Sequence, residues 1–468
     1  MADEIQPPDG STLLAVPPAD AAAPPLPTAV RFDRVDRNSF AITAIIAFAG
    51  YWFTLSQEVT LEWSGMLSTS AYYAGVGPPP GYPVWTFYSW LFAHLIPFSN
   101  IAWRIAIGSA VASAAACGLA SLLISYGGRV LCNSLTTFST LELRMQDWLR
   151  RGCGGAAGLV LAFSSTVWDQ AVIVEVRGLS LLLWAGLLCL LMRWFFDPAR
   201  KRFVCGAFLL FGMLLTNSQD MIVALPGLVC AIMLGNTKLG RDVALSVLPL
   251  VVLSTIPSQY NALWTVFLKE MNWPMLGAVV VVVLAAIALT VKTRRVGTEW
   301  KAALFCGFAF SAGLAFYFYE PIASMTNPPV NWAYPRTVEG FSHLISRGQY
   351  NKVIPTGDFF SYLGQLQILW LMVGKSFGWL YLVFAALPFF FLRRFDSVGR
   401  RWLFAMLAVF LSVSLLLLAL LNPPPDRGAR ELIELYFGPA YLVLAVWLGL
   451  GLMMVGAKLT KPGGKLAS

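Results

Sequence analysis

The sequence predicts an all-α polytopic membrane protein with about twelve membrane-spanning helices. Of its 468 residues, 57% are hydrophobic and only 12% are charged, which is about half the charged fraction of a typical soluble domain. Apolar runs of helical length recur along the chain. Lysines and arginines concentrate in every second connection between these runs, as expected for a multi-pass protein with a fixed orientation.

The N-terminal segment, residues 1–36, is predicted to be a disordered cytoplasmic tail. Its stretch PPADAAAPPLP is rich in alanine and proline and offers too few large apolar residues to bury a core. The segment also lacks the basic start of a signal peptide. Arg31, Arg34 and Arg37 precede the first apolar run, and basic residues at that place favour a cytoplasmic N-terminus.

The membrane domain is predicted to cover residues 37–457, and a cytoplasmic tail follows at 458–468. The predicted spans are 39–55, 100–126, 153–168, 178–196, 203–216, 220–235, 242–257, 274–292, 300–319, 362–392, 402–421 and 435–456. Connections assigned to the inside carry about three quarters of the 33 lysines and arginines. We therefore expect both termini in the cytoplasm of a cell and the bundle in its inner (plasma) membrane.

The first outward loop, residues 58–97, is predicted to form an elbow between two short helices. Gly75, Gly77 and Gly81 bracket three consecutive prolines, which favours a stiff extended turn. Residues 82–96 are rich in aromatic side chains, which is typical of a helix that lies along a membrane surface. We call residues 58–97 the elbow loop.

Polar and charged residues collect in the outward loops, whereas the predicted spans hold almost no ionisable residue near their centres. A transporter usually carries charges or broken helices near the middle of the membrane. The sequence therefore argues against a transporter. It favours a site at the outer interface, which a lipid-borne substrate would enter from the leaflet. A catalytically inactive scaffold that binds a lipid carrier would have the same charge distribution and remains an alternative.

The composition also argues against several kinds of site. No pair of the seven cysteines falls in an exported loop, so no disulfide framework is predicted. The chain has two histidines and no cysteine–histidine cluster, which argues against a zinc or haem site. The net charge of +9 comes from the loops that set the topology, and we expect no nucleic-acid partner.

Three segments are similar to those of known proteins and occur in the expected order and topological setting. They are TLEWSGMLSTSAYYAGVGPPPGYPVW, STVWDQAVIVEVRGLSLL and EPIASMTNPPVNWAYPRTVEGFSHLISRGQY. They resemble a family of multi-pass proteins related to protein O-mannosyltransferases, within the glycosyltransferase-C superfamily, and the resemblance runs over residues 39–452. It implies a helical bundle with amphipathic helices and a catalytic carboxylate in the first outer (periplasmic) loop. It also implies a polyprenyl-phosphate sugar as donor and inverting transfer outside the cytoplasm to a protein, lipid or glycan.

The chain departs from the family pattern at three positions. Where the family has the aspartate of a D-S-G-E pattern this chain has Trp63, and the histidine usual before P-P-G is Pro79. The arginine usual after P-I is Ala323. Two acids stand close by, namely Glu62 directly before Trp63 and Glu320 just ahead of the P-I pair. Either the base has moved by a residue or this branch has lost sugar transfer.

The implied reaction defines which residue types are needed. An acceptor hydroxyl has a pKa far above 7, so a carboxylate within about 3 Å must take its proton. We predict Glu62 as this base, with Glu320 as the alternative. The developing charge on the leaving phosphate needs arginine, lysine, backbone N–H groups or a divalent metal ion, and no metal or other cofactor is assigned. The predicted phosphate ligands are Arg177, Arg336, Arg347 and Arg430, with Glu175, Asn327 and Asn331 in support.

We predict that the elbow loop, the 169–177 connection and the 320–350 loop wall a single cavity. Each candidate residue also has a purely structural interpretation. Glu175 and Arg177 are close enough in sequence to pair with each other. Asn327 and Asn331 flank two prolines and have the residue type that stabilises turns.

Overall fold

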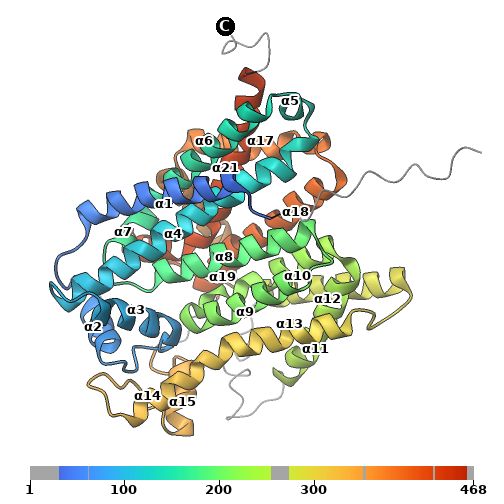
Figure 1. The fold of residues 1–468 in the computed structure, drawn as a ribbon. Coiled ribbons are helices and arrows are strands. Elements are labelled where there is room, and N and C mark those ends of the chain that lie inside the picture. The colour runs from blue at the N-terminus through green and yellow to red at the C-terminus, as the bar shows by residue number, and fades with distance from the viewer. Residues whose placement is uncertain (1–30, 62, 255–272, 351–354, 425–426, 461–468) are drawn as a thin grey trace, which may run out of the picture. The chain divides into compact units, whose positions relative to one another are not determined.

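The part of the chain that the computed structural model describes is almost entirely helical, as the sequence predicts (Figure 1). The described residues are 31–61, 63–254, 273–350, 355–424 and 427–460. The predicted disordered tail therefore falls almost wholly outside the described residues.

The helices carry the following labels and bounds. The first part of the chain forms α1 (Arg34–Thr54), α2 (Ser64–Tyr72), α3 (Pro83–Leu95), α4 (Ile101–Val130), α5 (Thr136–Ser139), α6 (Leu143–Ala162), α7 (Ser165–Ala171), α8 (Arg177–Phe196), α9 (Arg202–Asn217), α10 (Ala224–Gly235) and α11 (Thr237–Ser254). The second part forms α12 (Trp273–Thr293), α13 (Trp300–Leu314), α14 (Tyr319–Met325), α15 (Val338–Ile345), α16 (Phe359–Phe377), α17 (Trp379–Phe390), α18 (Ser397–Leu411), α19 (Leu417–Leu421), α20 (Arg427–Glu434) and α21 (Gly438–Leu459). Two 3₁₀ turns matter below, η2 (Gln219–Val223) and η7 (Leu435–Phe437).

Every apolar run predicted as a span contains helix, but not all of these helices can cross a membrane. Within the described residues, five helices are long and apolar enough, or six if the bent pair α16–α17 counts as one span. The five are Ile101–Val130, Arg177–Phe196, Trp300–Met325, Ser397–Leu421 and Glu431–Leu459. The prediction of about twelve spans is therefore wrong.

Helix length and charge explain the difference. α9 has 16 residues and α10 has 12. At 1.5 Å per residue they reach about 24 and 18 Å, less than the roughly 30 Å of the hydrocarbon core. α6 has 20 residues, but Arg144, Asp147 and Arg150 lie in its first half. Apolar composition marks a buried helix, whereas a span also needs sufficient uncharged length.

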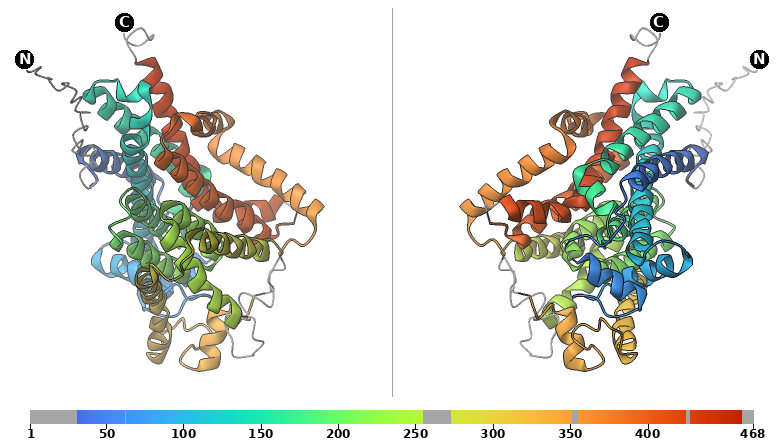
Figure 2. Two further views of the ribbon diagram at one scale, coloured as in Figure 1. Left: turned by 90° about the vertical axis from the view of Figure 1, so that its right-hand side faces the viewer. Right: turned by 90° about the vertical axis from the view of Figure 1, so that its left-hand side faces the viewer.

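The predicted run 362–392 is a bent helix pair instead of one straight span. α16 and α17 meet at an angle of 105° (Figure 2). The break falls at Gly378, whose φ of 82° lies in the left-handed region that favours glycine. α17 then packs along α21.

The centre of the bundle is α4, a helix of 30 residues that packs against α1, α6 and α8. Its many alanines, glycines and serines let neighbouring backbones come close. α9 and α13 also cross closely. A methyl group on Gly212 would lie 2.9 Å from the Cα of Gly313, so this crossing requires glycine.

A buried ionic network joins α1, α4 and α6. Nη2 of Arg150 lies 2.7 Å from Asp33 and 2.8 Å from Asp36. Arg129 forms a further ion pair with Asp33 at 2.9 Å, and Ser125 donates a hydrogen bond to Asp36 at 2.6 Å. Because charges removed from water are stable only when paired, this network holds the three helices in one register.

The elbow loop contains the two short helices predicted around its glycine–proline turn, α2 and α3. Figure 1 shows them at the same end of the bundle as α14 and α15. One isolated parallel bridge, between Val76 and Asn331, joins the elbow loop to the loop after α14. The next section starts from this end of the bundle.

Candidate functional site

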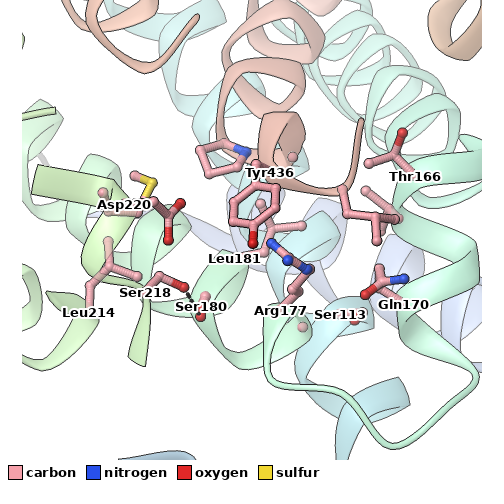
Figure 3. Close-up of a pocket in the computed structure, with 16 residues that line it drawn as sticks. Ser113, Thr166, Gln170, Arg177, Ser180, Leu181, Leu214, Ser218, Asp220 and Tyr436 are labelled. Atoms are coloured by element: carbon pink, nitrogen blue, oxygen red, sulfur yellow. Dashed lines mark hydrogen bonds between the residues drawn. The ribbon is translucent and has the colours of Figure 1, made fainter. Parts of the chain in front are cut away.

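A pocket lies where the ends of several helices meet (Figure 3). Its lining comes from α4, α7, α8, α9, η2, η7 and the start of α21. The lining atoms leave about 480 Å³ free, open solvent included. The polar side chains that line it include Ser113, Thr166, Gln170, Arg177, Asp220 and Tyr436. Hydroxyl, amide, carboxylate and guanidinium groups therefore face one space.

Arg177 supplies the positive charge on the pocket lining. It is the first residue of α8, and its guanidinium carbon lies 3.9 Å from the centre of the Tyr436 ring, a close cation–π contact. Its Nε lies 4.0 Å from Oε1 of Glu175, at the outer limit of an ion pair. The ring orients the guanidinium without neutralising it, and Glu175 offsets the charge only in part.

One long helix, α8, begins at the pocket and presents its first turn through Arg177 and Gly178. Gly438 and Pro439 line the pocket from within the helical run Glu431–Leu459, in which α20 and η7 lead directly into α21. A helix N-terminus carries partial positive charge and unsatisfied N–H groups. The start of α8 therefore adds to the attraction that Arg177 exerts on an anion.

Asp220 brings the opposite charge into the same pocket. It belongs to η2 and interacts electrostatically with both Arg177 and Arg347. Among the described residues, however, no direct ion pair joins Asp220 to either arginine. The carboxylate and the two guanidinium groups are therefore close enough to influence one another without closing into a salt bridge.

The elbow loop is tied to the helices around the pocket by hydrogen bonds. Asn217, at the end of α9, accepts a hydrogen bond from the Trp85 backbone N–H at 3.1 Å and donates one to Ser180 at 3.1 Å. The Trp85 indole donates to the Glu175 backbone carbonyl at 3.1 Å. Burial raises the pKa of the Tyr82 phenol, and the carboxylate of Glu175 raises it further. α3 is thus fixed against the segment that carries Arg177.

The elbow loop also contacts the 320–350 loop. The Val76 N–H donates to the Val330 carbonyl at 3.0 Å, and the Trp332 N–H donates to the Val76 carbonyl at 3.2 Å. Val76 packs there in a small apolar cluster with Ala323 and Leu344. These contacts hold α14 against the segment that contains the glycine–proline turn.

Glu320 lies at this junction and is fully buried. Its carboxylate faces Gly81, whose φ is +98°, and a methyl group at Gly81 would lie 2.5 Å from the carboxyl carbon. Neither carboxylate oxygen has a hydrogen-bond partner among the described residues. A buried carboxylate without a partner is costly, which marks Glu320 as a residue retained for more than packing.

Most of the elbow loop and most of the pocket lie in a region that matches a known family. Residues 64–240 match the family model of the protein O-mannosyl-transferase TMEM260 N-terminal domain. The mouse protein O-mannosyl-transferase TMEM260 is 26% identical to this chain over 319 residues. The chain is a distant homologue of TMEM260. The aligned region covers 67% of this chain and 34% of the mouse protein, so the chain spans about a third of the length of that relative. No solved structure matches the chain.

The region matched to the TMEM260 domain contains some of the candidate residues and not others. Gln170, Arg177 and Asp220 lie inside it, and Glu62 lies two residues before its start. Glu320 lies beyond its end. Arg177 is thus the sequence-predicted phosphate ligand that both lines the pocket and falls in the matched region.

The other predicted phosphate ligands occupy different places. Arg336 is exposed, and its Nη1 donates a 2.8 Å hydrogen bond to Asn327 in a surface turn. The Arg347 guanidinium lies 5.0 Å from the Tyr350 ring centre and acts on Asp220 from outside the pocket lining. Arg430 belongs to α20, and its side chain is not among the described parts of the structure.

Glu62, the predicted base, lies outside the described residues. Its neighbour Trp63 packs edge-on against Trp332, with ring centres 6.1 Å apart. Asn331 donates to the Ser324 carbonyl at 3.2 Å, while its own side-chain oxygen has no partner in the described structure. The position next to Glu62 therefore lies at the junction with the 320–350 loop.

The predicted single cavity differs from the pocket that the structure contains. The 169–177 connection lines the pocket through Gln170 and Arg177. In the described structure, the elbow loop and the 320–350 loop are absent from the lining and act on it electrostatically through Tyr82 and Arg347.

Sequence reasoning missed several of the pocket's own side chains. Asp220 is the first residue of one predicted span and Tyr436 is the second residue of another. The sequence therefore assigns both to the membrane. Ser113 and Gln170 carry no local pattern that marks a site. The one available signal was the carboxylate of Asp220 at the outward start of an apolar run.

Proposed function

We propose that this protein is a membrane glycosyltransferase that moves a sugar from a polyprenyl-phosphate donor to an acceptor outside the cytoplasm. The distant homology to a protein named as an O-mannosyl-transferase supports sugar transfer as the reaction. The observation that carries the proposal is Arg177, which faces a polar pocket at the first turns of α8 and α21. A multi-pass protein of the inner (plasma) membrane with cytoplasmic termini would present this pocket to the outer leaflet.

In the proposed reaction, Arg177 and the N-terminus of α8 hold the donor phosphate. The acceptor oxygen attacks the anomeric carbon, the bond from that carbon to the phosphate oxygen breaks, and the lipid phosphate leaves with the electron pair. The acceptor proton passes to a carboxylate. Charge on the leaving phosphate rises as the bond breaks, so a fixed cation stabilises the transition state more than the ground state.

Glu62 is the proposed base and Glu320 is the alternative. The contact with Gly81 keeps the Glu320 carboxylate inside the elbow loop, away from solvent. An acceptor would reach Glu320 only after the turn around Gly81 had moved. Trp63, the neighbour of Glu62 in the sequence, is 42% exposed, and this exposure favours Glu62 as the base.

Arg336, Arg347 and Arg430 remain proposed phosphate ligands, and the electrostatic interaction of Arg347 with Asp220 supports Arg347. Glu175, Asn327 and Asn331 are proposed to support the site. The described residues contain no group of three or more histidine, cysteine or carboxylate side chains placed to hold a metal ion.

A catalytically inactive scaffold that binds a lipid carrier is the second candidate function. The observation that favours it is Trp63, which occupies the expected position of the base and packs against Trp332. A transporter is less favoured, because apart from Ser113 within α4 the pocket is lined by residues near helix ends.

Sugar transfer by the purified protein in liposomes tests the proposal. The liposomes contain a radiolabelled polyprenyl-phosphate mannose, and soluble acceptor peptides or glycans are supplied outside. Arg177→Ala should lower transfer by about a hundredfold or more, because it removes the fixed cation at the leaving phosphate. Arg200→Ala is the matched control, since Arg200 pairs with Asp197 at 2.9 Å and is absent from the pocket lining.

Equal transfer by Arg177→Ala and the parent would contradict the proposed role of the pocket. The scaffold would be supported if the parent bound polyprenyl-phosphate mannose and other polyprenyl-phosphate sugars but transferred none of them.

A further inference from the structure

The pocket contains more hydrogen-bonding groups than a phosphate can use. Gln170 is 7% exposed and its Oε1 has no hydrogen-bond partner among the described residues. Ser113 is 1% exposed and its Oγ likewise has no partner there. Both side chains line the pocket. A buried amide or hydroxyl oxygen left without a partner is costly, so these atoms point to a polar ligand.

Asp220 adds a charged acceptor to this set. Carboxylate and amide oxygens accept hydrogen bonds, whereas a phosphate oxygen has no proton to donate at neutral pH. Asp220 and the Oε1 of Gln170 therefore do not suit the phosphate itself. They suit a neighbouring group that is rich in O–H donors. In the view of Figure 3, Asp220 and Gln170 lie on opposite sides of Arg177.

A sugar joined to a phosphate has both kinds of group next to each other. Its phosphate needs a cation, which Arg177 supplies, and its hydroxyls need acceptors within a few ångströms of that cation. A carboxylate accepts two hydrogen bonds at once and so fits two hydroxyls on adjacent carbons. Since Asp220 forms no direct ion pair with Arg177 or Arg347 among the described residues, its oxygens are not occupied by those cations.

We propose that Asp220, together with Gln170, binds the sugar hydroxyls of the donor beside the phosphate on Arg177, and that Asp220 makes the pocket selective for a neutral sugar with two adjacent hydroxyls. This inference rests on the proposed function. It assigns Asp220 as a residue that determines specificity, distinct from the base.

The selectivity follows from charge. An acidic sugar such as a glucuronyl group would bring its carboxylate close to Asp220, and Glu175 lies 4.0 Å from Arg177 in the same region. Two carboxylates in a partly desolvated site repel each other strongly. A deoxy sugar would lose the donor that Asp220 needs and leave the carboxylate unsatisfied.

The simplest alternative is that Asp220 only balances the charge of Arg177 and Arg347. In that case Asp220→Asn would change the affinities of two phosphate ligands of equal charge by the same factor, whether or not one of them carries a sugar. If Asp220 binds the sugar, the effect depends on whether a sugar is present and on its charge. The ratio between ligands therefore separates the two roles.

Calorimetric titration of the full chain in detergent micelles gives this ratio. The probes are a short isoprenyl methyl phosphate and the mannosyl and glucuronyl esters of the same isoprenyl phosphate. The methyl and mannosyl esters carry the same single negative charge on the phosphate. The parent should bind the mannosyl ester about tenfold or more tightly than the glucuronyl ester. Asp220→Ala should lower the affinity for the mannosyl ester by about tenfold to a hundredfold. The affinity for the sugar-free phosphate should stay unchanged or rise.

Asp220→Asn should reduce the preference of the parent for the mannosyl over the glucuronyl ester. Asp197→Asn, the same change of carboxylate to amide outside the pocket, should alter none of the three affinities. Melting curves of each variant establish that it is folded. If neither Asp220 variant folds, the parent's own preference decides the question, because equal affinity for the two esters would overturn the proposal.

The titrations distinguish failure of the proposed function from failure of the proposed role of Asp220. If the parent binds none of the three probes, the proposed function fails. If the parent binds them, but Asp220→Ala changes the affinities of the sugar-free phosphate and the mannosyl ester by equal factors, the role of Asp220 fails and the proposed function stands.

Discussion

The contact between Gly81 and Glu320 gives a sharp prediction for the elbow loop. Gly81→Ala forces a non-glycine residue to a φ of +98°, which costs roughly 1–2 kcal/mol. The added methyl group would lie 2.5 Å from the carboxyl carbon of Glu320, and overpacking of this kind costs roughly 1–3 kcal/mol more. The total expected loss of stability is about 2–5 kcal/mol.

The second part of that loss depends on Glu320. In a Glu320→Ala background the carboxylate is gone, so Gly81→Ala should cost only the backbone part, roughly 1–2 kcal/mol. The coupling between the two changes should therefore be about 1–3 kcal/mol. Denaturation of the four proteins in mixed micelles, followed by tryptophan fluorescence, measures it.

Gly364→Ala is the matched control. Gly364 lies inside α16, and a methyl group there would meet no atom within 4 Å. The change should be neutral or stabilising by up to about 1 kcal/mol, because alanine favours helix. If Gly81→Ala costs the same with and without Glu320, the carboxylate does not lie against the turn and the reasoning is refuted.

Two further predictions concern the base and the packing of α9. Glu62→Gln keeps the shape of the side chain and removes the proton acceptor, so sugar transfer should fall by about a hundredfold while donor binding persists. Glu58→Gln in the same loop is the control and should leave transfer unchanged. Transfer at the parent's rate by Glu62→Gln would contradict Glu62 as the base, and Glu320→Gln would be the next variant to test. The Sγ atoms of Cys205 and Cys306 lie 3.7 Å apart between α9 and α13, so a membrane-permeant oxidant should cross-link them. Peptide mapping without reductant should recover the two helices as one linked species, and recovery of both thiols unreacted would contradict this helix pairing.

The sequence predicts the helical class well but not the number of spans. Hydropathy located the runs that become α4, α8 and α21, because each is both apolar and long. It could not separate these from α9 and α10, which are apolar because they are buried and yet too short to cross. Hydropathy also does not detect the break at Gly378, because a single glycine barely changes the mean hydropathy of an apolar run.

The site could be predicted only where charge stood out against an apolar background. Arg177 and Glu175 were found because they interrupt a short outward connection. Ser113 and Gln170 come from helices far apart in sequence and become neighbours only through the packing of α4, α7 and α8. Glu320 is buried against Gly81 of the elbow loop, a long-range contact that no local pattern reveals.

The most direct test of the central claim is a structure of the full chain with a bound polyprenyl-phosphate mannose, determined in lipid nanodiscs. The phosphate should lie within about 3 Å of the Arg177 guanidinium, next to the first turns of α8 and α21. A phosphate bound at Arg336, or anywhere else out of reach of Arg177, would contradict the assignment of this pocket as the donor site.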